Sequence, residues 1–164
     1  NHRSYIDILV AHAAVNVPFR WMAKSELFRI PVFGAAMRVL GHIPVERGRA
    51  IAASKAIERA EEALRTGSSI WVFPEGTRTP LEKLGRFKRG AFVLALRTGA
   101  PLLPVTIIGS DGIFRGPFRI TPRRVKVIVS APAFVDPASK GALSVFIDAV
   151  RRRIQSEYDR ACSA

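Results

Sequence analysis

An imidazole and a carboxylate lie five residues apart at the start of the chain. His2 precedes a helix that we expect to begin near Ser4, and Asp7 falls in the first turn of that helix. If the chain bends at Ser4, Asp7 can bind one ring nitrogen of His2 and leave the other free to accept a proton. This arrangement predicts a general base. Ser4 and Asp7 also fit a capping box, which needs no catalytic role for His2, and the two interpretations can coexist.

A second polar group follows an apolar run of strand-forming residues, Ile70 to Phe73. The next residues are Pro74-Glu75-Gly76-Thr77-Arg78. Ligands of open α/β sheets bind outside the carboxyl ends of the strands, so we expect a substrate at this loop. Arg78 offers a fork for a phosphate, Gly76 allows close backbone approach, and Glu75 could orient Arg78 or a substrate hydroxyl. The alternative is an ordinary turn with solvated side chains.

The composition favours one globular domain with an anionic partner. The chain has 164 residues, 48% of them apolar, and its 26 Lys and Arg exceed its 13 Asp and Glu. These values exclude disordered, collagen-like and coiled-coil classes, and the length suits a single core. The lone Cys162 excludes an intrachain disulfide framework. The positive charge favours phosphorylated metabolites, acidic lipid headgroups or nucleic acid.

Much of this charge is concentrated in residues 76–126, which hold eleven Lys and Arg against two acids. Four Phe residues are interleaved with these cations, at positions 87, 92, 114 and 118. Such a pattern suits nucleic-acid stacking or an anionic lipid surface, although any one of these cations could simply be solvated. The sequence lacks a Gly-rich phosphate loop ending in Lys-Ser/Thr, Cys or His pairs at metal spacing, and a Gly-x-Ser-x-Gly elbow, which disfavours nucleotide hydrolysis, zinc chemistry and a serine nucleophile.

Hydrophobic periodicity predicts an α/β domain with a largely parallel or mixed central sheet flanked by helices. Helices are expected from Ser4 to Val17, over residues 31–40 with Pro31 in the first turn, around Ala53–Leu64, over Lys88–Thr98, and from Leu143 to Tyr158. Strands are expected at His42–Val45, at Ile70–Phe73 buried on both faces, at Leu102–Ile108 and at Val125–Val129. Pro104 predicts that the third of these strands is irregular or at an edge.

Four blocks in this order resemble the motifs of the glycerolipid acyltransferase family, the His-x4-Asp acyltransferases related to 1-acylglycerol-3-phosphate acyltransferase. Asn1-His2 with Asp7 is similar to the first motif, and Gly41–Arg47 to the second. Phe73–Arg78 is similar to the Phe-Pro-Glu-Gly-Thr-Arg third motif, and Pro101–Val105 to the apolar fourth. The resemblance spans residues 1 to about 105. It implies an acyltransferase domain over residues 1–164, truncated at its N-terminus, where the family usually has a further strand and membrane-associating helices.

The resemblance also implies a mechanism and a site. His2, oriented by Asp7, would deprotonate the free hydroxyl of an acylated glycerol phosphate, which would attack the thioester of acyl-CoA or acyl-carrier protein with no acyl-enzyme. The catalytic residues are thus His2 and Asp7. The residues implied to bind the acceptor phosphate are Arg47, Glu75, Gly76, Thr77, Arg78 and Lys88. No cofactor or metal is expected besides the thioester co-substrate.

The implied acceptor is 1-acylglycerol 3-phosphate, which would be converted to phosphatidic acid in phospholipid biosynthesis. The expected location is the cytoplasmic face of the cell membrane, against an anionic surface and with no nucleic acid as partner. Two alternatives remain open: the same chemistry on glycerol 3-phosphate or a lyso-aminolipid, and a non-enzymatic basic module that binds an anionic membrane or nucleic acid.

Overall fold

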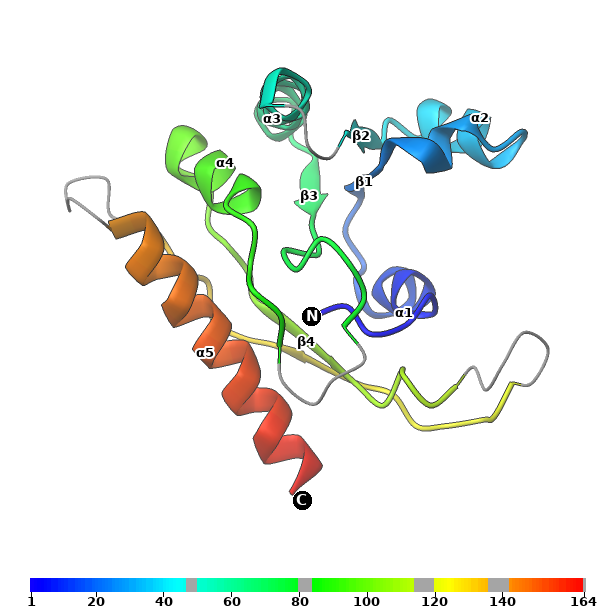
Figure 1. Cartoon of the computed structure of the whole chain (residues 1–164), viewed down its shortest axis with the longest axis vertical. Helices are drawn as coiled ribbons and strands as arrows, with labels where there is room; N and C mark the ends of the chain where they lie inside the picture. The colour runs from blue at the N-terminus through cyan, green and yellow to red at the C-terminus, as the bar shows by residue number, and fades with distance from the viewer. Residues whose placement is uncertain (47–49, 80–83, 114–119, 136–141, 164) are drawn as a thin grey trace. The chain divides into compact units, whose positions relative to one another are not determined.

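The computed structural model describes residues 1–46, 50–79, 84–113, 120–135 and 142–163. The chain divides into two compact units, one formed by Asn1–Asn16 with Phe73–Ala164 and the other by Val17–Val72. We refer to them as the discontinuous unit and the central unit. Helices and strands occur in both (Figure 1), which confirms the predicted α/β class. That residues 1–164 act as one acyltransferase domain stays a prediction.

The central unit is built on a parallel sheet of three strands in the order β2-β1-β3. These strands are β1 (Phe19–Lys24), β2 (Ile43–Val45) and β3 (Ser69–Trp71). Helix α3 (Ala50–Arg65) packs against the sheet through a buried stripe that contains Ala56, Ile57, Ala60 and Ala63. The predicted helix around Ala53–Leu64 is confirmed, and Gly67, with φ of +84°, follows its C-terminal end.

Two features of the central unit differ from the sequence-based expectations. The strand expected at Ile70–Phe73 to be buried on both faces is half-buried, because the sheet has three described strands and β3 lies at its edge. The helix expected over residues 31–40 begins later, as α2 (Phe33–Val39). Pro31 lies in a tight turn before it, where the Phe33 N–H donates to the Pro31 carbonyl and Val32 has φ of +63°. Strand β1 and the short helix η1 (Ser25–Arg29) were not predicted.

The discontinuous unit joins the first sixteen residues to the C-terminal part of the chain. It contains α1 (Asp7–Ala14), α4 (Gly90–Thr98), β4 (Val105–Ile108), β5 (Lys126–Val129) and α5 (Ala142–Cys162). β4 and β5 pair antiparallel, and an isolated bridge between Leu102 and Ala133 extends the pairing beyond Pro104. The predicted irregularity at Pro104 is therefore confirmed. Gly99, with φ of +69°, is the C-cap residue of α4, whose last residue is Thr98 as predicted.

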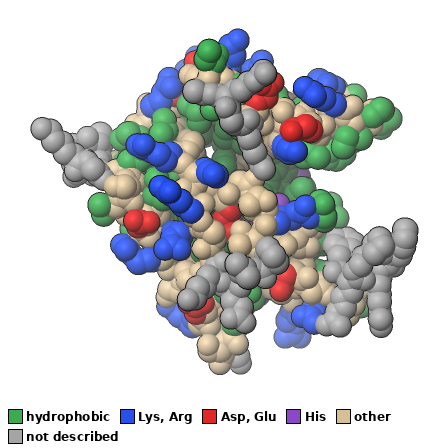
Figure 2. Space-filling view, viewed as in Figure 1, with side chains coloured by type: hydrophobic (Ala, Val, Ile, Leu, Met, Phe, Trp, Pro, Cys, Tyr) green, Lys and Arg blue, Asp and Glu red, His purple; other side chains and the backbone are tan. Residues whose placement is uncertain are grey.

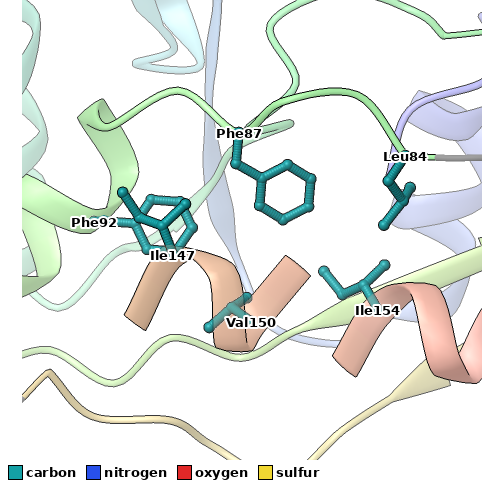
Figure 3. Packing of buried hydrophobic residues seen from close by; sticks show 6 residues of the cluster. All are labelled: Leu84, Phe87, Phe92, Ile147, Val150 and Ile154. Carbon is teal, nitrogen blue, oxygen red and sulfur yellow. The ribbon is translucent and has the colours of Figure 1, made fainter. Parts of the chain in front are cut away.

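A buried hydrophobic cluster joins α5 to residues 84–92, which lie before and at the start of α4 (Figure 3). Leu84 and Phe87 from this segment and Phe92 from α4 pack against one side of α5. The residues of α5 in the cluster are Ile147, Val150 and Ile154, which repeat at helical spacing. Two of the four phenylalanines in the cationic segment are thus core residues.

Helix α1 buries a different face from the one its apolar periodicity predicts. Its buried residues are Asp7 and Ala11, whereas Leu9 is exposed. A carboxylate takes the innermost position because several hydrogen bonds compensate its burial, as described below. Among the described residues, no helix is both long enough and apolar enough to cross a membrane.

Gly34 is required where α2 approaches η1. A Cβ atom at this position would overlap the backbone carbonyl group of Phe28. Backbone cannot yield as the end of a flexible side chain can, so we expect Gly34→Ala to lower the free energy of unfolding by about 1–3 kcal/mol. Urea unfolding followed by circular dichroism measures this change. Ala35→Ser, at an exposed position of the same helix, is the control, and equal stability of the two variants would contradict the predicted overlap.

Candidate active site

The predicted imidazole–carboxylate pair is formed in the discontinuous unit. His2 Nδ1 lies 2.8 Å from Asp7 Oδ2, and the His2 side chain is 16% exposed while that of Asp7 is fully buried. An ionised carboxylate only accepts hydrogen bonds, so Nδ1 donates to it, and in the neutral imidazole the lone pair then lies on Nε2. The Ser4 N–H also donates to Asp7 Oδ2, at 2.9 Å, which is one half of the predicted capping box. The box is incomplete, because α1 begins at Asp7 with Ile6 as its N-cap residue and no side-chain cap, and the catalytic role of His2 stays a prediction.

Asp7 is held in its charged form by the chain that surrounds it. Burial by itself favours the neutral acid, but hydrogen bonds from His2, from Ser110 and from the Ser4 and Arg3 backbone outweigh it and lower the pKa of Asp7. The Arg3 N–H lies 2.7 Å from Asp7 Oδ2. Oδ1 is buried with no hydrogen-bond partner of good geometry among the described residues. Asp7 can therefore keep the His2 tautomer fixed and stabilise an imidazolium when one forms.

Asn1 fixes the backbone of this pair to β4. Its side-chain Nδ2 donates to the Ile107 carbonyl at 2.8 Å, and its Oδ1 accepts the Ile107 N–H at 2.7 Å. The amide thus pairs with the strand as a neighbouring backbone would. The sequence places Asn1 in the first motif beside His2, but nothing in the motif predicts this pairing with a distant strand. The contact also gives the apolar fourth block a structural function, since that block leads into β4.

The third motif supports His2 from the other side. The His2 ring stacks on Phe73 with a centroid separation of 3.9 Å and an interplanar angle of 12°. The His2 backbone N–H donates to Glu75 Oε1 at 2.9 Å, and its carbonyl accepts the Thr79 N–H at 3.1 Å. The loop that carries Arg78 is therefore bonded directly to the residue proposed as base.

Glu75 binds backbone groups, and does not orient Arg78 as the sequence suggested. It is 4% exposed, and its second oxygen, Oε2, accepts the Gly85 N–H at 3.1 Å. One carboxylate thereby bridges the His2 and Gly85 backbones, which are far apart in sequence. Its predicted contact with the acceptor phosphate stays a prediction.

Three further residues of the predicted phosphate site, Gly76, Thr77 and Arg78, lie on the same loop, and Lys88 lies against it. Gly76, with φ of +71°, lies against the Lys88 side chain, whose Cγ would be 3.4 Å from a Cβ at that position. The Lys88 N–H also donates to the Pro74 carbonyl at 2.7 Å. Thr77 and Arg78 are exposed, and the Arg78 guanidinium covers the Tyr5 ring, 3.4 Å from its centroid. The structure thus gathers Gly76, Thr77, Arg78 and Lys88 beside the His2 backbone.

Some predicted residues lie outside the described part of the chain. Arg47, assigned to the phosphate site by resemblance, is among them, as are Lys83, Arg115 and Arg119 of the cationic segment. Phe87 and Phe92 are buried in the core and cannot stack on bases from the surface. This placement weakens the nucleic-acid alternative. Within the described ranges, no group of three or more His, Cys, Asp or Glu is placed to hold a metal ion.

The amino-acid sequence matches a known protein family over most of its length. The sequence model of the family described as acyltransferase matches residues 1–108. The chain therefore belongs to the acyltransferase family, as the four motifs predict. The match includes the His2–Asp7 pair and the Phe73–Arg78 loop.

Individual relatives agree with this assignment. A chloroplastic 1-acyl-sn-glycerol-3-phosphate acyltransferase of Brassica napus is 36% identical over 69% of this chain and 33% of its own length. The 1-acyl-sn-glycerol-3-phosphate acyltransferase of Borreliella burgdorferi is 37% identical over 70% of this chain and 46% of its own. The crystal structure of the 1-acyl-sn-glycerophosphate acyltransferase PlsC from Thermotoga maritima superposes with a TM-score of 0.74 at 30% identity, covering 97% of this chain and 64% of that one. The chain thus spans a third to half of the length of these two curated relatives.

The environment of Asp7 predicts a pH dependence of stability. Because the folded-state pKa of Asp7 is lowered, its ionisation stabilises the fold at pH values above about 4, the usual pKa of an unfolded Asp. That contribution is lost as the pH falls through the folded-state value. We expect Asp7→Asn to lower the free energy of unfolding at pH 7 and to flatten its decline below pH 4, in urea titrations from pH 2.5 to 7. Asp148→Asn removes an exposed carboxylate as the control, and matching profiles for both variants would refute this role of Asp7.

Proposed function

We propose that this chain transfers a fatty acyl group from a thioester donor, acyl-CoA or acyl-carrier protein, to the free hydroxyl of 1-acylglycerol 3-phosphate, giving phosphatidic acid. The observation that carries the proposal is the 2.8 Å contact between His2 Nδ1 and Asp7 Oδ2, on a backbone bonded to the loop of Arg78. The printed names of the relatives support the choice of acceptor. The site belongs to one compact unit, so each contact used here lies within that unit.

The chemistry follows from the free Nε2 of His2. This nitrogen takes the proton of the acceptor hydroxyl as its oxygen attacks the thioester carbonyl carbon. The C–O bond forms, the C–S bond breaks, and the thiolate that leaves takes the proton from the imidazolium. Asp7 stabilises the imidazolium between these two steps. The protein forms no covalent bond with the acyl group.

The cationic loop positions the acceptor for this attack. Arg78 can bind a phosphate through two parallel N–H donors, and Lys88, whose side chain lies against Gly76, adds a point charge. Holding the phosphate fixes the distance between the hydroxyl and Nε2, and positioning of this kind accounts for a large part of enzymatic rate enhancement. Thr77, Glu75 and Gly76 complete the described part of the proposed phosphate site, and the role of Arg47, which lies outside the described residues, stays a prediction.

Replacement of the base tests the proposed activity. We expect His2→Ala to lower kcat by about a hundredfold to ten-thousandfold with little change in KM, because positioned acid–base catalysis contributes about that much. The assay follows transfer of a labelled acyl group from acyl-CoA to 1-acylglycerol 3-phosphate. His12→Ala, at an exposed position of α1, is the control. Full activity of His2→Ala would exclude His2 as the base, and competition with glycerol 3-phosphate or a lyso-aminolipid would identify a different acceptor.

An anionic membrane surface at the cytoplasmic face is the proposed working environment. In the central unit, residues 27–45 contain no acid and two exposed arginines, Arg29 and Arg38. Hydrophobic side chains gather over α2 in the space-filling view (Figure 2). The exposed apolar residues of this segment are Ile30, Val32, Phe33, Val39 and Leu40. Apolar side chains flanked by cations suit the boundary between anionic headgroups and acyl chains.

Vesicle binding tests this surface. We expect Phe33→Ser with Val39→Ser to weaken partitioning onto vesicles of phosphatidylglycerol and phosphatidylcholine by about tenfold or more, since burying one such side chain contributes about 1.5–3 kcal/mol. Co-flotation measures the partitioning. Ile51→Ser, at an exposed apolar position of α3 in the same unit, is the matched control. Unchanged flotation of the double variant would contradict the proposal. The proposal would also be contradicted if sedimentation velocity showed that the original chain self-associates and that the double variant does not.

A further inference from the structure

The contact between Arg78 and Tyr5 has a geometry that leaves the arginine free to bind an anion. The guanidinium carbon Cζ lies 3.4 Å from the centroid of the Tyr5 ring, which places the cation against the face of the ring. The N–H donors of a guanidinium lie in its own plane, so a ring that covers its face uses none of them. Among the described residues, no carboxylate forms an ion pair with Arg78.

Tyr5 is an exposed aromatic residue at a position where its backbone is fixed. It is 66% exposed, so the core does not explain its ring. It lies inside the His-x4-Asp segment, where Asp7 accepts the Arg3 and Ser4 N–H groups and the Ile6 N–H lies 3.4 Å from Ser4 Oγ. The base of the Tyr5 side chain is therefore held relative to His2.

Arg78 is thus tied to the base by two routes. Its neighbour Thr79 donates a backbone hydrogen bond to the His2 carbonyl, and its own side chain rests on Tyr5. A long arginine side chain on an exposed loop would otherwise sample many rotamers, and ordering it on binding costs free energy. An aromatic surface that orders the side chain beforehand reduces this cost.

We propose that Tyr5 is a positioning residue that holds the Arg78 guanidinium with its N–H fork open toward the phosphate of the acceptor. The inference rests on the proposed function, since it assigns a role within the same phosphate site. Tyr5 thereby orients Arg78, a role that the sequence suggested for Glu75. Glu75 instead accepts hydrogen bonds from backbone groups with both of its oxygens. The His-x4-Asp segment then supplies both the base, His2, and the aromatic ring that supports Arg78, the arginine that binds the phosphate.

The first test separates KM from kcat. We expect Tyr5→Leu to raise KM for 1-acylglycerol 3-phosphate about two- to fivefold, the size of an exposed cation–π contact, with kcat changed less than twofold. Tyr5→Phe keeps the ring and restores the original KM. Leu9→Ala alters a side chain of α1 that is 63% exposed, and so controls for loss of apolar surface. An unchanged KM for Tyr5→Leu, or a Tyr5→Phe variant as weak as Tyr5→Leu, would overturn the proposal.

A double-mutant cycle tests whether Tyr5 acts through Arg78. In an Arg78→Ala background, we expect Tyr5→Leu to leave KM unchanged, because the guanidinium that it supports is absent. The same increase in both backgrounds would show that Tyr5 acts by another route, and would overturn the proposal.

A binding measurement makes this test independent of turnover. Isothermal titration calorimetry with glycerol 3-phosphate should show two- to fivefold weaker binding to Tyr5→Leu than to the original chain, and no loss for Tyr5→Phe. If the original chain transferred no acyl group to 1-acylglycerol 3-phosphate, the proposed function would fail, but this binding difference would still report on Tyr5. Equal affinity of the original chain and Tyr5→Leu would overturn the inference even if the proposed activity were found.

Discussion

The site depends on one buried negative charge. Asp7 is fully enclosed, and an isolated carboxylate in such a place would take up a proton. Two backbone N–H groups and the His2 ring converge on its Oδ2, and they can do so only if residues 2–7 follow one particular path. Burial of this charge therefore requires one backbone conformation of residues 2–7, and that conformation determines the orientation of the His2 ring. For the same reason the buried face of α1 begins with a carboxylate, which is followed one turn later by Ala11.

The chemistry of the site could be predicted from the sequence better than its support. His2, Asp7, Gly76 and Arg78 stand in short motifs whose residue types limit what they can do, and the structure brings them together as expected. Asn1 and Ser110 form their contacts with Ile107 and Asp7, which are about a hundred residues away in the sequence, and no local pattern encodes such pairings. The bond from Gly85 to Glu75 spans ten residues, and its geometry depends on the path of the chain between them. Glu75 shows the limit clearly, since its acidity suggested an arginine partner while its burial directs it to backbone N–H groups.

The fold could be predicted to a similar extent. Helices with a strong amphipathic period and a glycine stop, such as α3 and α4, agree with expectation within a few residues at each end. Strand β1 and helix η1 were missed, because their short runs mix charged and aromatic residues without clear alternation. The two-faced burial expected for β3 depended on the number of strands in the sheet, which is a property of the whole unit.

The amide of Asn1 has a consequence for how this site would respond to change. It matches the N–H and C=O of Ile107 in both length and polarity, so it transmits the path of β4 directly to the neighbouring imidazole. A shift of that strand would reach the proton-accepting nitrogen even if every side chain around the substrate were unaltered. Substitutions along β4 should therefore alter turnover through the position of the imidazole.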